Sequence, residues 1–461
     1  MYNSGMKIFS HLLLAVASAS VCAVHAAPST PTVAAAQLQQ KFVEVLRNMV
    51  KTGSDDFYDA AVLVLNATGD ESVFLPMMEK AAAAGSSAAQ YWLAVQKLPF
   101  TESGSKEYDE AMLMLNKAVK GKYSPALILS AQVKAQLGDT NGALADLMEA
   151  CRLGNPKARA IYLMQTGRLE PGNLELPEIA SELKKKNYYL EELIAGMQTT
   201  EQAAYEWINR AKEHGSPTAP CLLSQIPERT PEEALPDLKL AAERHNIMAL
   251  YMYGVVRYQG SALSAEFEEN PAEAKQLLQL AAMLGSPEAS AILAEFYAIG
   301  HFAGATPERT YKLFAYAARY GLPNGIAGVG LCKVLGAGCK ADVDLGLKLL
   351  NSARDKGGQW ANKALASLYF NGCAGIKPDL RKALDFLSED AVHGGVLSYS
   401  LAAGIAAVGT SENPADSSMA EYYLDVATSM PEFAEEARRM YNIIVAKKEW
   451  YFMPVLEKSV K

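Results

Sequence analysis

The sequence is poor in the residues that most catalytic and metal sites require. Only four of its six histidines follow residue 26, and its six cysteines include no Cys-x-x-Cys pair. It also contains no Gly-x-Ser-x-Gly, His-Glu-x-x-His or Gly-x4-Gly-Lys pattern. These absences argue against zinc sites, hydrolase elbows and phosphate-binding loops. We therefore expect a protein that is not an enzyme and has neither a metal nor a cofactor.

Positive charge is also scarce. Forty-three Lys and Arg face 51 Asp and Glu, which gives a formal charge of −8. An acidic balance disfavours nucleic acid and anionic membrane surfaces as partners. With 50% hydrophobic and 20% charged residues, the chain is rich enough in apolar side chains to fold around a core.

The N-terminus is typical of a secretory signal peptide. Lys7 precedes an apolar run that ends in the small residues before Pro28. We expect cleavage after Ala26, with Ala27 as the near alternative. A membrane anchor is the competing interpretation, but the run is short and interrupted by polar residues. No later stretch reaches 18 apolar residues, so we expect no transmembrane segment in the mature chain, which would be periplasmic or secreted outside the cell.

A repeat with a period near 36 residues organises the rest of the chain. An Ala-x-x-x-Gly pattern recurs at Ala281, Ala317 and Ala353, each 36 residues after the last. Weaker matches extend it in both directions at intervals of 30 to 40 residues. The full set of anchors is Met49, Ala81, Ala118, Ala150, Ala180, Ala211, Ala241, Ala281, Ala317, Ala353, Ala391 and Ala427.

Independent signals support this repeat and make it helical. A glycine stands 19 residues after each of four successive anchors, at Gly260, Gly300, Gly336 and Gly372, although Gly is only 33 of 461 residues. Apolar residues between 361 and 369 recur at i, i+3, i+4, i+7 and i+8, which is one helix face. Each unit is therefore expected to be a helical hairpin that must stack on its neighbours to bury its apolar faces.

The residues of one unit resemble a Sel-one-like repeat, a branch of the tetratricopeptide superfamily. The pattern runs Ala361-x3-Leu365-x3-Tyr369-x2-Gly372-x2-Gly375-Ile376-x2-Asp379-x2-Lys382-Ala383 and closes with Ala391-x3-Gly395. Lys333 and Arg257 depart from it where the family usually has an aromatic residue. The resemblance is specific over roughly 241–430 and only suggestive over 45–215. It implies an all-α, right-handed α-solenoid of about 11–12 stacked hairpins that binds proteins or peptides.

Composition shifts divide the chain further. Five prolines between 217 and 237 indicate either an irregular repeat boundary or a hinge between two solenoids. An acidic insertion at 263–270 is either a solvated loop or part of a binding face. The tail after residue 445 is a cap over the last helix pair or a docking motif. The predicted segments are a signal peptide 1–26, a flexible lead 27–44, degenerate repeats 45–216, the proline-rich break 217–237, a Sel-one-like solenoid 238–445 and a capping tail 446–461.

The resemblance also implies where a partner would bind. In the family, stacked first helices line a concave groove, at positions 10, 14, 17 and 18 past each anchor. Packing between repeats is an equally good interpretation for Tyr251 and Phe370. The groove positions in this chain include Tyr251, Tyr258, Gln259, Glu295, Lys363, Phe370 and Asn371.

Five cysteines remain after the leader, namely Cys151, Cys221, Cys332, Cys339 and Cys373. Secreted members of the resembled family can carry a disulfide within each unit. Here a bridge of Cys339 with Cys332 or Cys373 is open beside the alternative of buried free thiols, and the odd count leaves at least one thiol free.

The function we expect is an exported, non-catalytic scaffold that binds a protein or peptide partner of unknown identity in its groove. The alternative is a periplasmic cell-wall or β-lactam-binding enzyme that uses a Ser-x-x-Lys serine. Ser103-x-x-Lys106 and Ser181-x-x-Lys184 fit that pattern, as Lys51-Thr52-Gly53 fits Lys-Thr-Gly. No Ser-Asp-Asn accompanies them, and patterns this short arise by chance in a chain of 461 residues.

Overall fold

The fold is a succession of short helices. The structure, a computed structural model, describes residues 32–98, 104–260, 268–392, 395, 397–429, 431 and 433–458. Over these ranges it contains helices and one isolated β-bridge, between Cys373 and Ile376, but no strand. The all-α prediction is confirmed. The predicted leader, Ser103 and most of the acidic insertion lie outside the described residues.

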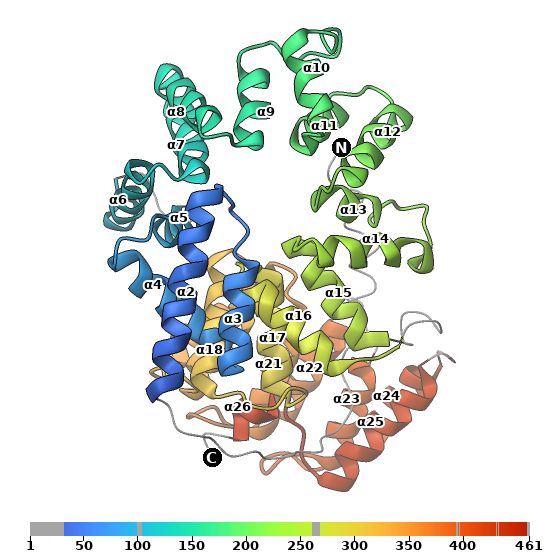
Figure 1. The fold of residues 1–461 in the computed structure, drawn as a ribbon. Helices are drawn as coiled ribbons and strands as arrows, with labels where there is room; N and C mark the ends of the chain where they lie inside the picture. The colour runs from blue at the N-terminus through green and yellow to red at the C-terminus, as the bar shows by residue number, and fades with distance from the viewer. Residues whose placement is uncertain are drawn as a thin grey trace. The chain divides into compact units, whose positions relative to one another are not determined.

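The helices form two compact units, which meet in the sequence between Ser286 and Pro287. Figure 1 draws the helices coloured along the chain and labels most of them. The helices of the N-terminal unit are α2 Thr32–Thr52, α3 Tyr58–Thr68, η2 Glu71–Val73, α4 Phe74–Ala83, α5 Ser87–Lys97, α6 Lys106–Lys120, α7 Ser124–Gln136, α8 Thr140–Arg152, α9 Pro156–Gln165, α10 Pro177–Lys184, α11 Tyr188–Gly196, α12 Glu201–Glu213, α13 Thr218–Leu223, α14 Pro231–Glu243, α15 Ile247–Gln259 and α16 Pro271–Met283. Those of the C-terminal unit are α17 Pro287–Ile299, α18 Pro307–Arg319, α19 Pro323–Leu335, α20 Val343–Asp355, α21 Gln359–Asn371, α22 Leu380–Val392, α23 Ser398–Val408, α24 Ser417–Thr428, α25 Ala434–Lys447 and α26 Pro454–Lys458.

The repeat predicted from the anchors is confirmed helix by helix. Every anchor from Met49 to Ala427 lies in an even-numbered helix, so each of α2 to α24 with an even number is the second helix of a unit. The odd-numbered helices are the first helices, and some consecutive ones contact one another, as α17 does α19 and α19 does α21. The anchor residues are buried except for Ala180 and Ala391, which are half-buried. In these two units the residue before the anchor, Ile179 or Asp390, is buried in its place.

The glycines that marked the repeat end the first helices. Gly260, Gly300, Gly336 and Gly372 all have positive φ, between 49° and 86°, a conformation that other residues resist. Glycine also permits close contact between helices. A Cβ on Gly330 in α19 would lie 2.9 Å from the carbonyl oxygen of Gly346 in α20, so these two backbones touch directly.

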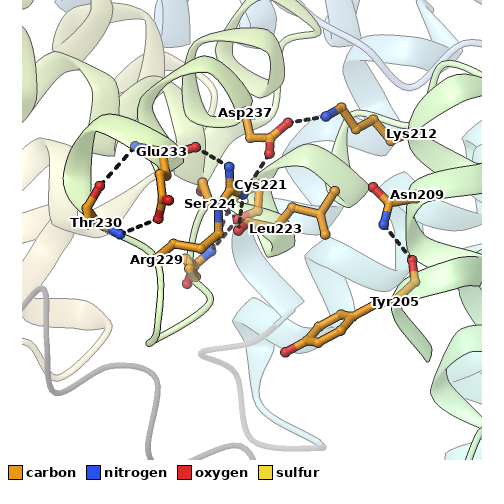
Figure 2. Close-up of polar contacts among 11 residues, drawn as sticks. Tyr205, Asn209, Lys212, Cys221, Leu223, Ser224, Arg229, Thr230, Glu233 and Asp237 are labelled. Carbon is orange, nitrogen blue, oxygen red and sulfur yellow. Dashed lines mark hydrogen bonds and ion pairs between the residues drawn. The ribbon is translucent and has the colours of Figure 1, made fainter. Parts of the chain in front are cut away.

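The proline-rich segment 217–237 folds into the whole of α13, a turn and the start of α14. Pro231 occupies the first turn of α14, where its missing N–H is not needed, and Thr230 with Glu233 forms a capping box. Asp237 in α14 is paired with both Lys212 of α12 and Arg229 of the turn (Figure 2). Burial alone would raise the pKa of Asp237, but hydrogen bonds from the two cations outweigh burial and leave that pKa lowered.

Candidate functional site

In the C-terminal unit, the first helices hold the end of the chain against one of their faces. We call this surface of α17, α19 and α21 the first-helix face, and Trp450–Lys458 the C-terminal segment. The short helix α26 contacts α17 and α19. Met453 and Leu456 are both 0% exposed and share a hydrophobic cluster with Ala294 of α17 and Leu335 of α19. The face is therefore covered by a peptide of the protein itself.

Polar groups of α21 hold the same segment through its backbone. Asn371 Nδ2 donates to the carbonyl oxygen of Trp450 at 2.8 Å. The amide of Phe452 donates to Ser367 Oγ at 3.2 Å, and that hydroxyl donates to Glu457 Oε2 at 2.5 Å. Asn371, one of the predicted groove residues, thus binds a peptide backbone in the structure.

The segment does not fill the face completely. A cavity of about 220 Å³ lies between it and α21. That volume exceeds the roughly 30 Å³ that one water molecule occupies in the liquid. The cavity is lined by Leu335, Ser367, Leu368, Asn371, Cys373, Ala374, Tyr451 and Glu457.

Two more predicted residues come together across this unit. Glu295 of α17 is only 7% exposed, and burial raises its pKa to about 8, an effect that the nearby charge of Lys363 in α21 partly opposes. Lys363 also lies 3.5 Å from a carboxylate oxygen of Asp390, which accepts a hydrogen bond from Ser398. A carboxyl in such a place is neutral over most of the physiological pH range.

The remaining predicted residues are divided between packing and surface. Phe370 is 6% exposed and belongs to the cluster around α22 and α23, so for this residue the structure shows packing between repeats. Tyr251 and Tyr258 are half-buried and Gln259 is buried, all on α15 of the N-terminal unit. The predicted set therefore has three residues in the N-terminal unit and four in the C-terminal unit.

The N-terminal unit contains a polar cluster that sequence reasoning missed. Asp56 lies 2.6 Å from His245 Nδ1, and Asp55 lies 3.5 Å from Lys157 Nζ. The rings of Tyr58 and His245 stack at 3.7 Å, and Tyr123 donates a hydrogen bond to the carbonyl of Ser54. These contacts join residues up to 189 positions apart. No local sequence pattern predicts such pairs. They connect the start of α3 to α7, α9 and α15.

The nucleophile patterns lie on helix surfaces. Ser181 and Lys184 are exposed residues of α10, and Lys51 and Thr52 are exposed at the end of α2. The five cysteines after the leader are free. Burial raises the pKa of Cys221 to about 11 and that of Cys332 still further, which keeps these two thiols protonated and unreactive.

Neither a metal site nor a membrane span is found within the described residues. They contain no group of three His, Cys, Asp or Glu side chains placed to hold a metal ion. Within the same ranges, no helix is both long and apolar enough to cross a membrane.

Comparison with known proteins finds similarity in structure only. No family model and no curated protein matches the sequence. One similar solved structure is c5321, a protective antigen of uropathogenic Escherichia coli with an SLR fold, at 15% identity and a TM-score of 0.39; the match covers 87% of this chain and 97% of the antigen. A Sel1 repeat protein from Oxalobacter formigenes is 22% identical with a TM-score of 0.38, over 51% of this chain and 96% of that one.

A third structure, yeast Tom70, is 15% identical with a TM-score of 0.27, over 92% of this chain and 98% of its own. Two of the three are described as SLR or Sel1 repeat proteins.

Proposed function

We propose that the protein is an exported, non-catalytic repeat scaffold that binds a protein or peptide partner through its first helices. One observation carries the proposal. The first-helix face of the C-terminal unit holds a peptide, the chain's own C-terminal segment, by a backbone hydrogen bond from Asn371 and a buried apolar contact at Leu456. A surface that binds one peptide in this way has the chemistry to bind others.

Export rests on the leader. Lys7, the apolar run and the small residues before Pro28 are the features that a signal peptidase reads. We expect protein expressed with its leader to accumulate outside the cytoplasm with Ala27 as its first residue. The mass of the intact purified protein checks this. Retention of residues 1–26 in the exported fraction would favour the membrane-anchor alternative.

Partner binding is tested by placing a photocrosslinking amino acid at two positions of the N-terminal unit. Tyr258 lies on a first helix, α15, among the predicted groove residues, whereas Lys239 is exposed on a second helix, α14. We expect irradiation in the cell envelope to give a discrete crosslinked protein from position 258 and none from position 239. The measurement is a gel shift followed by mass spectrometry of the excised band.

The control position, 239, shows whether a crosslinked band from position 258 is specific. Equal products from both positions would indicate non-specific contact, and no product from position 258 would contradict partner binding at the first helix α15. A mutant folding defect does not confuse the result, because both variants carry the same bulky side chain and their helix content is compared by circular dichroism.

A further inference from the structure

We propose that the C-terminal segment is a displaceable ligand bound in cis, and that it reveals the class of peptide that the first-helix face binds in trans. That class is a short helical turn that starts apolar-Pro and has a second apolar residue three positions on, followed by an acid. In this chain the pattern is Met453-Pro454-x-Leu456-Glu457. The inference rests on the proposed function and names the partner's chemistry.

The two apolar side chains of the pattern, Met453 and Leu456, pack into the hydrophobic cluster of the first-helix face. Met453 and Leu456 are three residues apart, so within one helical turn they lie on the same side of α26. Both are 0% exposed among the alanines of α17 and the larger side chains of α19. Small alanines on the face create the depth that a longer apolar side chain fills.

The acidic side chain of the pattern, Glu457, is recognised by the hydroxyl of Ser367. Glu457 accepts from Ser367 Oγ through one oxygen and from the amide of Met453 at 2.7 Å through the other. The carboxylate thus caps its own helical turn and joins that turn to α21 at the same time. Because Glu457 is only 4% exposed, a peptide with an apolar residue in its place would leave this buried hydroxyl without its acceptor.

Several features make the segment displaceable. Helix α26 has five residues, too few to be stable without its docking surface. Lys448, in a left-handed conformation with φ 54°, ends α25, and only Glu449 separates it from Trp450. Outside the buried patch the segment is held by the hydrogen bond from Asn371 to Trp450 and by the exposed pair of Lys458 with Glu449, of which the pair contributes little in water. The cavity beside Tyr451 leaves space for a partner with a bulkier side chain.

The short connection sets the strength of the competition. A ligand tethered by one or two residues has an effective concentration on the order of millimolar. A free peptide of equal intrinsic affinity therefore competes poorly with the attached segment. Releasing the segment should raise the apparent affinity for a free peptide without any change in the face itself.

The experiment uses the full-length protein and a fluorescent peptide with the sequence of residues 449–458. Leu456→Asp places a charge in the apolar cluster and should release the attached segment. We expect the peptide to bind this variant at least about tenfold more tightly than it binds the wild type, as measured by fluorescence anisotropy. Equal or undetectable binding to both proteins would overturn the inference.

Controls separate release from damage. Circular dichroism must show the same helix content for Leu456→Asp and wild type; a variant that loses helix is replaced by Met453→Asp, which releases the segment from its other apolar position. Ser367→Val in the released background should weaken peptide binding, because Glu457 loses its hydrogen bond. A peptide with Asp at the position of Leu456 should not bind.

Two further outcomes are informative. A wild-type dimer in size-exclusion chromatography that dissociates in Leu456→Asp would assign the face to the segment of a second copy and overturn binding in cis. The Tyr258 crosslink is independent of this segment. Peptide binding without that crosslink would retain this inference and reject the groove on α15, and the reverse result would do the opposite.

Discussion

Replacing Asp237 with asparagine is expected to lower the free energy of unfolding by about 2 kcal/mol, because two cations then lose their shared carboxylate in a partly buried place. Arg229 Nη1 lies 2.7 Å from Asp237 Oδ2, and Lys212 is paired with the other oxygen. The Asp237 side chain is 8% exposed, while those of Arg229 and Lys212 are about a quarter to a third exposed, which limits the loss. Urea denaturation at pH 7 measures it.

The pH dependence of this loss has a definite sign. The pKa of Asp237 is lowered in the folded protein, so its contribution is present above the ordinary aspartate pKa and is lost as pH falls through the folded value. The gap between wild type and Asp237→Asn should be constant from pH 5 to pH 7 and shrink below about pH 4. Lys239→Ala on the same helix is the control. Its pair with Glu243 is exposed at 3.9 Å, so we expect a change below about 0.5 kcal/mol.

This variant also bears on the proline-rich segment. The pairs join α12, which precedes α13, and the turn that follows α13 to Asp237 of α14. Relative motion of α12 and α14 would have to break the pair of Lys212 with Asp237. If the segment is a hinge, Asp237→Asn should speed proteolysis between residues 213 and 231 far more than Lys239→Ala does. Equal proteolysis in the two variants would favour an irregular repeat boundary.

The sequence predicts the fold because the fold is local. A unit of about 36 residues needs one apolar face per helix and a glycine where the first helix ends, and both leave a periodic trace in the sequence. The positive φ of Gly300 and Gly336 is the conformation that this trace implies. The periodic pattern is less regular at Ala180, where the preceding residue, Ile179, is the buried one, as expected for a degenerate unit.

The site is harder to predict because it depends on contacts between distant residues. Nothing near Trp450 in the sequence indicates that its carbonyl accepts from Asn371, 79 residues earlier. Ser367 and Glu457, 90 residues apart, were missed for the same reason. Asn371 was predicted because a repeat frame identifies which positions face the groove. The frame does not say what lies in that groove.

The division into units was also beyond the sequence. Prolines between 217 and 237 suggested a break, but the two compact units separate between Ser286 and Pro287. Pro287 occupies the first turn of α17, where proline is tolerated, so it leaves no mark different from Pro323 in α19. Proline content therefore does not identify the boundary of a compact unit here.

Glu295→Gln is expected to change how stability depends on pH. Burial raises the pKa of Glu295 to about 8 in the folded protein, above the ordinary glutamate value. Between the two values the folded state binds a proton that the unfolded state has lost, so wild-type stability falls as pH rises. Glutamine cannot ionise. Relative to the variant, the wild type should lose about 1 kcal/mol per unit from pH 5 to pH 8, as measured by urea denaturation at each pH.

Replacing Lys363 tests the same pKa shift in a second way. Its charge opposes the effect of burial on Glu295, and it is itself paired with Asp390. Lys363→Gln should raise the pKa of Glu295 further and so extend the loss of stability to higher pH, while the pH at which the loss begins stays the same. Glu308→Gln, an exposed change on α18, should leave the pH profile unchanged. Parallel wild-type and Glu295→Gln profiles would mean that the pKa of Glu295 is not raised in the folded protein and that its carboxyl is already ionised at neutral pH.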